Sequence, residues 1–276
     1  MSTDELGWSN GLRMRTYGES GPIAIALHGG AAASGCAGPI ARGLADSFRV
    51  LEPWQRLSGP EPLTVATHVA DLHKLVTIQT GQPPALAGHS WGAMLALAYA
   101  AKHPDTISAV VLVGCGTFDT NARARMKEII SGRLTDDDRH TIAEIERTTP
   151  DHGESLMKRY EIIGRTYDFD TLEDTDEMAE PFDGKAHKET GDDVIRLQAS
   201  GAHPAAFSAI TTPVLMLHGD YDPHPGRMIR DGLKENIPHI EYHELARCGH
   251  EPWNERHARD EFFHVMKVWL AGVMES

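Results

Sequence analysis

The chain has 276 residues, of which 41% are hydrophobic, and a formal net charge of −14 at pH 7. This length and apolar content suffice for one large α/β domain, or for one domain that carries an insertion. The negative charge argues against nucleic acid and against an anionic membrane surface as partners, because both are polyanions.

The cysteines and the N-terminal residues favour a cytoplasmic protein. Cys36, Cys115 and Cys248 form no C-x-x-C pair, and a sparse, odd number of cysteines suits a reducing compartment. The first residues are acidic and lack the apolar stretch of a signal peptide. The longest apolar runs, such as residues 109–113, are too short to span a bilayer. The oligomeric state stays open.

The first 113 residues alternate between strand and helix patterns. Strands are expected at residues 12–17, 22–27, 48–52, 84–87 and 107–113, and helices at 40–47, 65–76 and 94–101. The runs 22–27 and 107–113 are almost entirely apolar, which is typical of strands that are covered on both faces. This alternation predicts a mostly parallel sheet with helices on both faces.

Residues 118–205 interrupt the alternation. They show helical patterns and no convincing strand, and strand patterns resume at 213–218 and 240–245, before a closing helix. We therefore predict that residues 118–205 form a helical cap or lid, inserted in an α/β core of residues 1–117 and 206–276.

The expected insertion is acidic. Its Asp and Glu residues outnumber its Lys and Arg residues by 21 to 12, and eight acids fall between Asp168 and Asp183. Thr135, which precedes three aspartates, predicts the N-cap of a helix. The acidic stretch is interpreted either as a solvated surface segment or as a negative lining that attracts a cationic substrate.

The segment Gly88-His89-Ser90-Trp91-Gly92 lies between an expected strand and an expected helix. A G-x-S-x-G sequence in this context predicts a nucleophile elbow. Gly88 and Gly92 leave room for the sharp turn that exposes the Ser90 hydroxyl. The following helix directs its positive end and its free N–H groups toward the point where negative charge would develop.

A serine nucleophile requires a base and a carboxylate that orients this base. Asp220 and Asp222 follow the strand expected at 213–218, and His250 follows the strand at 240–245. Loops at the carboxyl ends of parallel strands are where α/β sheets place their sites. Ser90, one of the two aspartates and His250 are therefore expected to meet at one edge of the sheet.

These motifs resemble the α/β-hydrolase superfamily over nearly the whole chain. The matching pieces are Leu27-His28-Gly29-Gly30, the elbow at 88–92, the Gly219-x-x-Asp222 turn and Gly249-His250. Four motifs in the right order are much more specific than any one of them. The resemblance implies an α/β-hydrolase fold with a helical cap. No cofactor is expected, because the sequence has no flavin, nicotinamide or phosphate-binding glycine loop.

The resemblance also implies the roles of individual residues. It assigns Ser90 as the nucleophile, His250 as the base and Asp222 as the carboxylate that orients it, and it places an oxyanion hole at the backbone N–H groups of Gly30 and Trp91. Asp222 is preferred because the family's acid usually stands three residues after the glycine. Asp220 is then expected to brace the turn.

Several nearby residues allow a second interpretation. His218, Asp220, Asp222 and His224 alternate along the chain and would form a metal site if the segment stayed extended. The Gly219 break and the turn after Asp222 argue against that, so no metal is expected. His28 is expected to hold the oxyanion loop and His89 to pack beside the site. Trp253 is a candidate for contact with the substrate.

The substrate expected from these features is a small acyl compound. We predict a serine hydrolase that cleaves an ester, thioester or lactone through an acyl-enzyme. Residues 90–96 are also similar to proline iminopeptidases, which bind a substrate ammonium through acids in the cap, but Ala31, Ala32 and His89 depart from that family's pattern. An aminopeptidase, or a non-catalytic ligand-binding protein of the same fold, remains an alternative.

Overall fold

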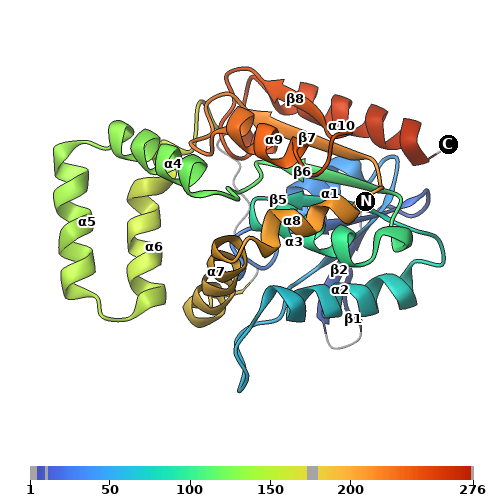
Figure 1. The fold of residues 1–276 in the computed structure, drawn as a ribbon, viewed down its shortest axis with the longest axis horizontal. Helices are drawn as coiled ribbons and strands as arrows, with labels where there is room; N and C mark the ends of the chain where they lie inside the picture. Colours follow the sequence, from blue (N-terminus) through green and yellow to red (C-terminus); the bar gives the residue numbers. More distant parts are fainter. Residues whose placement is uncertain (1–4, 10–11, 173–179, 275–276) are drawn as a thin grey trace.

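The computed structural model describes residues 5–9, 12–172 and 180–274. Its strands are β1 (Glu5–Ser9), β2 (Leu12–Tyr17), β3 (Ile23–Leu27), β4 (Arg49–Pro53), β5 (Ala85–His89), β6 (Ala109–Val113), β7 (Val214–Gly219) and β8 (Glu241–Leu245). Within the described residues they form one sheet in the order β1-β2-β4-β3-β5-β6-β7-β8 (Figure 1). β2 pairs antiparallel with β1 and with β4, and the other neighbours are parallel. The predicted mostly parallel sheet is thereby confirmed.

Helices cover both faces of the sheet, because successive side chains of a strand point to opposite faces. Ala24 and Ala26 of β3 pack in a core with α1 (Gly38–Leu44) and α10 (Arg259–Met274). Ile25 and Leu27 of the same strand pack in a second core with α2 (Val65–Gln79), α3 (Trp91–Lys102) and α9 (Gly226–Lys234). Each core buries apolar residues of strand and helix together, which explains why β3 is apolar along its length.

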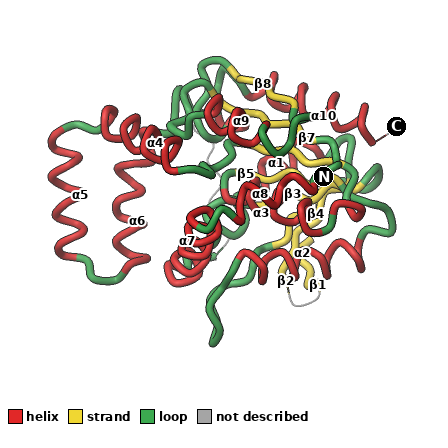
Figure 2. The backbone as a smooth tube through the Cα atoms, viewed as in Figure 1, coloured by secondary structure: helices red, strands yellow, loops and turns green. Residues whose placement is uncertain are grey.

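A helical region is inserted between β6 and β7, as the sequence predicts. It contains α4 (Thr120–Arg133), α5 (Asp136–Thr148), α6 (His152–Ile163), α7 (Gly184–Ala199) and the short α8 (Ala202–Ala205). Figures 1 and 2 show α5 and α6 side by side, projecting away from the sheet. Thr135 caps α5 in a reciprocal capping box with Asp138, which confirms the predicted N-cap. Residues 173–179, which carry part of the acidic stretch, lie outside the described residues.

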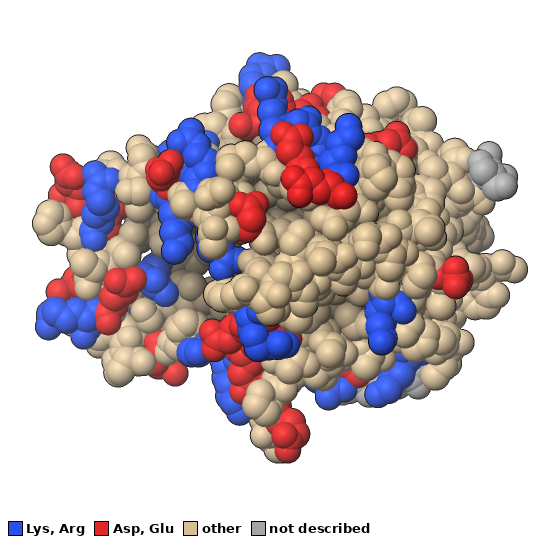
Figure 3. Space-filling view, in the orientation of Figure 1, with Lys and Arg blue, Asp and Glu red and all other residues tan. Residues whose placement is uncertain are grey.

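Carboxylates of α7 and of its N-cap residue, Asp183, connect the inserted region to the core. Asp183, Glu189 and Asp193 accept hydrogen bonds from the backbone N–H groups of Ser58, Leu63 and Val65 respectively, at 2.8–2.9 Å. By contrast, α5 has no buried side chain. Figure 3 shows acidic and basic side chains interspersed over the α4–α6 region, and a hollow between α6 and α7.

Two elements differ from the sequence prediction. β1 was not expected, and it pairs with β2 at the edge of the sheet. α9 begins at Gly226, directly after a segment interpreted as a turn, and buries Ile229 and Leu233 at helical spacing. The Pro223 and Gly226 signals conceal this short helix because both residues are typical of turns.

No helix among the described residues is long and apolar enough to cross a membrane. Cys36, Cys115 and Cys248 are all free cysteines. The cytoplasmic location stays a prediction.

Candidate active site

Ser90 stands in a strained turn between β5 and α3. Its backbone has φ 53° and ψ −114°, a conformation that is uncommon for a residue with a side chain. Its N–H donates to the Val113 carbonyl at 2.8 Å. A Cβ added at Gly88 would lie 2.2 Å from the Gly92 carbonyl oxygen, and one added at Gly92 would lie 2.2 Å from that of Leu27. The turn therefore requires both glycines of the predicted elbow.

The loop after β3 lies directly against the elbow. A Cβ added at Gly29 would be 3.2 Å from the Ser90 Cβ. Gly30 follows with φ 62°, and Trp91 is the first residue of α3. Among the hydrogen bonds that the described residues form, neither the Gly30 nor the Trp91 backbone N–H is a donor. Both N–H groups therefore have no hydrogen-bond partner within the part of the chain that the structure describes.

Gln55 connects the two segments that carry these N–H groups. Its backbone N–H donates to His28 Nε2 and its side-chain Nε2 donates to the His28 carbonyl, both at 3.0 Å. Its Oε1 accepts from Trp91 Nε1 at 2.6 Å. Burial lowers the pKa of His28 to about 4, so the ring is neutral and Nδ1 donates to the Gly29 carbonyl at 2.9 Å. His28 lies in the predicted position, whereas no motif in the sequence marks Gln55.

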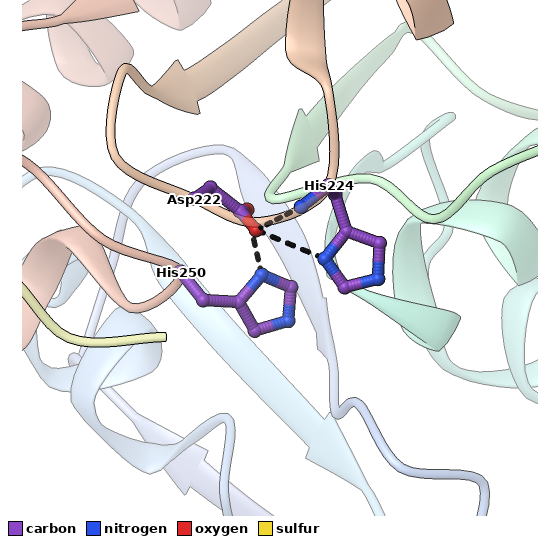
Figure 4. Close-up of side chains that lie close together, drawn as sticks. All are labelled: Asp222, His224 and His250. Atoms are coloured by element: carbon purple, nitrogen blue, oxygen red, sulfur yellow. Dashed lines mark hydrogen bonds and ion pairs between the residues drawn. The ribbon is translucent and has the colours of Figure 1, made fainter. Parts of the chain in front are cut away.

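Asp222 and His250 meet at the ends of β7 and β8. His250 Nδ1 donates to Asp222 Oδ2 at 2.7 Å, and both residues are buried (Figure 4). Burial raises the pKa of the Asp222 carboxyl, but the neighbouring histidines more than offset this and hold the pKa well below its usual range. Asp220 instead accepts from the Cys248 N–H at 3.2 Å, which braces the turn. The contact between Asp222 and His250 is the arrangement expected for an ionised carboxylate that orients an imidazole.

Ser90 and His250 flank the same turn at the end of β6. The Ser90 N–H binds the Val113 carbonyl, while a Cβ added at Gly114 would lie 3.0 Å from His250 Nδ1. His89 Nε2 donates to the His250 carbonyl at 3.2 Å. The hydrogen bonds of the described residues include none between the Ser90 hydroxyl and the His250 ring. Such contacts commonly tighten only when a substrate binds.

Two further histidines surround Asp222. His224 donates from both its backbone N–H and its ring Nδ1 to Asp222 Oδ1, each at 2.9 Å. His218 Nε2 lies 3.2 Å from Asp222 Oδ2 and 2.9 Å from the His224 carbonyl. Ring and carboxylate atoms of Asp222, His224 and His250 lie within 4.8 Å of one another, a spacing that a metal ion would also fit. Asp220, the fourth member of the alternating run, lies outside this group because it accepts from the Cys248 N–H.

The loop that follows α6 covers His250. The His250 N–H donates to the Tyr167 carbonyl at 2.9 Å, and the two rings meet edge to face at 5.3 Å. The buried Glu255 carboxylate accepts from the N–H groups of Gly249, Phe169 and Asp170, each at 2.8 Å. Sequence reasoning missed Tyr167 and Glu255, since neither belongs to a motif.

Trp253 occupies the core beside the site. Its ring packs edge to face on His89 at 4.6 Å and lies 6.4 Å from the Phe262 ring. It belongs to the buried cluster between the sheet, α1 and α10. These contacts explain its burial through packing and give no support to the predicted contact with substrate.

A groove of about 340 Å³ lies between α4 and α6 and ends at Tyr167. Its walls are mostly apolar and its rim carries two basic side chains; the lining residues are Lys127, Ile130, Ser131, Leu134, Leu156, Arg159, Tyr160, Ile163 and Tyr167. Tyr167 is the one lining residue whose ring also contacts His250 among the ring contacts of the described residues.

Several solved structures superpose on this chain over nearly its whole length. VinJ superposes with a TM-score of 0.69 at 17% identity, over 98% of this chain and 99% of its own. The enol-lactonase from Burkholderia xenovorans LB400 gives 0.61 at 19%, over 97% and 100% of the two chains. The thioesterase domain from the curacin biosynthetic pathway gives 0.58 at 16%, over 99% of each. At these identities the likeness shows the fold alone.

Comparison with protein families gives a match that covers most of the chain. Residues 24–265 match the Alpha/beta hydrolase family, a span that includes all four predicted motifs. No curated protein matches the chain. The fold, the four motifs and the family match agree, and the chain belongs to the alpha/beta hydrolase family.

Proposed function

We propose that the protein is a serine hydrolase that cleaves a small ester, thioester or lactone through an acyl-enzyme. Ser90 is the nucleophile, His250 the general base and Asp222 the carboxylate that orients it. The observation that carries this proposal is the buried 2.7 Å contact between His250 Nδ1 and Asp222 Oδ2, beside a turn that also binds the Ser90 elbow. Residues 118–205 are proposed as a cap over this site.

In the proposed reaction, His250 Nε2 takes the proton of the Ser90 hydroxyl as Oγ attacks the carbonyl carbon. The resulting oxyanion accepts hydrogen bonds from the backbone N–H groups of Gly30 and Trp91. His250 then gives its proton to the leaving group, and the acyl-enzyme forms. In the second half of the reaction, His250 takes a proton from water as the water oxygen attacks the acyl-enzyme carbonyl. His250 then returns this proton to Ser90, and the carboxylic acid product leaves. Asp222 stays ionised and stabilises the imidazolium throughout.

The groove between α4 and α6 supports an apolar acyl or alcohol group as the part of the substrate that is held. Leu134, Leu156 and Ile163 contribute to its walls. An enol-lactonase and a thioesterase domain are among the structures of similar fold, so the fold accommodates both lactone and thioester chemistry. A groove of about 340 Å³ fits a small acyl chain better than a lipid with two chains.

The direct test is the Ser90→Ala variant. We expect kcat toward p-nitrophenyl acetate to fall by about 10⁵–10⁶, because the covalent step is removed. A fluorophosphonate probe should label the wild-type protein and not the variant. Ser208→Ala, a change at an exposed serine, is the control and should behave as wild type. Retained turnover by Ser90→Ala would refute the acyl-enzyme, and a wild-type protein that neither reacts nor labels would favour a non-catalytic binder.

An aminopeptidase is the second candidate, favoured by acidic groups beside His250. Burial, with the charges of Asp168 and Glu255, raises the pKa of Glu251 to about 7. Burial raises that of Asp168 to about 6. A bound ammonium group would restore the ionised form of these carboxyls. Faster turnover of a proline arylamide than of p-nitrophenyl acetate, and loss of only the amide activity in Glu251→Gln, would replace the esterase assignment.

A further inference from the structure

Besides His250, Asp222 accepts a hydrogen bond from the ring of His224, and His218 Nε2 lies 3.2 Å from its Oδ2. Its Oδ2 accepts from His250 Nδ1 at 2.7 Å, and its Oδ1 accepts from His224 Nδ1 at 2.9 Å. The two rings are stacked, with centroids 4.7 Å apart and planes inclined by 21°. Figure 4 shows the carboxylate between the two Nδ1 atoms. A triad that only orients its base uses one such ring.

The second ring is held in place as firmly as the first. The His224 N–H also donates to Asp222 Oδ1 at 2.9 Å, and His218 Nε2 donates to the His224 carbonyl at 2.9 Å. The His224 side chain is 12% exposed, and the Asp222 side chain is fully buried. Because an ionised carboxylate only accepts hydrogen bonds, the proton on each neutral ring is at Nδ1.

We propose that His224 is a positioning residue that acts through Asp222: by donating to Oδ1, it limits how strongly the carboxylate holds the protonated form of His250. This rests on the proposed function for its role in turnover. His250 must accept the serine proton and then release it to the leaving group. A carboxylate whose charge is shared between two donors stabilises the imidazolium less, which favours the release step.

The same geometry couples the two rings electrostatically. The two ring centroids are 4.7 Å apart and both rings donate to one carboxylate, so a change at one ring acts on the other through Asp222. Other groups that face Asp222 and the two rings come from several elements and are His89, Cys115, Arg133, Tyr167, His218 and Cys248. All of these remain in each variant below, so differences between variants report on position 224.

The test compares pH profiles of kcat/KM for variants at position 224. His224→Phe keeps a ring against His250 but removes the donor. His224→Asn places an amide N–H near the position of Nδ1 and does not titrate. We expect the acid limb of His224→Phe to move up by roughly half to one pH unit, since His250 then retains its proton more strongly. The limb of His224→Asn should stay close to that of wild type.

Two further variants control this comparison. His224→Leu also lacks the donor and must give the same shift as His224→Phe; it replaces that variant if the phenylalanine fails to fold. His243→Asn changes a partly exposed histidine that donates to Glu261 at 2.8 Å, and it should leave the profile unchanged. Unchanged acid limbs in both donor-free variants, or a shift to lower pH, would overturn the proposal.

A measurement without turnover separates this inference from the proposed function. In the Ser90→Ala background, NMR titration of the His250 imidazole should show the same upward shift of its midpoint when His224→Phe is added. If the protein is not a hydrolase, the shift persists although no substrate reacts. If His224 has no influence through Asp222, the midpoint does not move although the wild-type protein hydrolyses esters.

Discussion

At the residue scale, the candidate site depends on buried polar side chains that hold one another. Gln55 uses its side-chain donor on the His28 carbonyl and its acceptor on the Trp91 ring N–H. It therefore joins the loop that carries Gly30 to the helix that begins at Trp91. The separation of the two proposed oxyanion donors depends on this one side chain.

We predict that Gln55→Leu lowers kcat about 10–100-fold toward p-nitrophenyl acetate and changes KM less. The displaced N–H groups would stabilise the oxyanion of the transition state less well, whereas substrate binding depends less on them. The variant should also lower the free energy of unfolding by about 1–3 kcal/mol, since two buried polar groups lose their partner. Steady-state kinetics and chemical denaturation measure both. Gln82→Leu, at an exposed position, is the control; equal behaviour of the two variants would contradict a role of Gln55 in the site.

The sequence locates the residues of the site that belong to motifs and misses those that act through distant contacts. Ser90 and His250 were predicted from their places after expected strands, and Asp222 was preferred to Asp220 through the family resemblance. The structure brings all three to the carboxyl edge of the sheet. Gln55 and His224 carry no such pattern. A lone glutamine after a strand has no preferred partner in sequence, and His224 was weighed only in an alternating run with three other residues.

At the element scale, β5 and α3 meet at the elbow so closely that neither Gly88 nor Gly92 has room for a side chain. Gly92 lies so close to β3 that a Cβ would fall 2.2 Å from the Leu27 carbonyl oxygen. Neither strand nor helix can move without disturbing the buried cores on both faces of the sheet. We therefore expect that alanine is not tolerated at this position, although alanine is the better helix former.

We predict that Gly92→Ala lowers the free energy of unfolding by about 1–3 kcal/mol or prevents folding, because overpacking forces backbone shifts. Gly191→Ala is the matched control within α7. A Cβ there meets nothing within 4 Å, so the change should stabilise the protein by about 0.5–1 kcal/mol. Urea denaturation of both variants measures the difference. Similar stability of the two variants would mean that the elbow has room the structure does not show.

The contact of α7 with the start of α2 is a second feature at this scale. Asp193 is buried and accepts from the Val65 N–H at the start of α2, while its neighbour Asp192 is exposed and pairs only with Lys188 in the same helix. We predict that Asp193→Ala lowers the free energy of unfolding by about 1–3 kcal/mol, since the Val65 N–H loses its acceptor. Asp192→Ala should change it by less than about 0.5 kcal/mol. Denaturation curves that coincide for the two variants would rule out the anchoring role of Asp193.

The elements themselves were predictable where burial leaves a periodic signal. Strands such as β6 are covered on both faces and are apolar throughout, so their positions follow from composition. β1 was missed because an edge strand of five residues that contains a glycine has no such pattern. α9 was missed because only Ile229 and Leu233 mark its buried face.

At the scale of the whole molecule, the proposed chemistry is placed where the two cores and the inserted helices meet. The ends of β5, β7 and β8 lie at one edge of the sheet, and the inserted region contacts His250 there through Tyr167. Several histidines are buried in the folded chain, and their burial lowers their pKa values. His28 and His68 have pKa values lowered by burial to about 4, and burial also lowers those of His89 and His218.

These histidines make the folded state sensitive to acid. Between their usual pKa of 6.5 and about 4, the unfolded chain binds protons that the folded chain does not. Stability therefore falls as the pH decreases through this window. Buried carboxyls with raised pKa values act in the opposite direction, namely Glu251, Asp168 and Glu52. Burial raises the pKa of Glu52 from 4.5 to about 7 despite its contacts with Arg15 and Tyr17. Between pH 4.5 and 7 the folded chain holds one more proton at Glu52 than the unfolded chain does.

We predict that the free energy of unfolding of the wild-type protein decreases from pH 6.5 to pH 5, and that it decreases more steeply in Glu52→Gln. Proton uptake by Glu52 in the folded chain stabilises the protein increasingly as the pH falls, and glutamine cannot take up this proton. The free energy of unfolding of Glu52→Gln should therefore fall more steeply than that of wild type, by up to about 1.4 kcal/mol per pH unit. By the same linkage, Glu52→Gln is more stable relative to wild type at pH 8 than at pH 5. Denaturation at four pH values measures the slopes, with the exposed Glu161→Gln as a control that should run parallel to wild type. If Glu52→Gln also runs parallel to wild type, Glu52 ionises equally in the folded and unfolded chains, and the burial of its carboxylate does not govern its protonation.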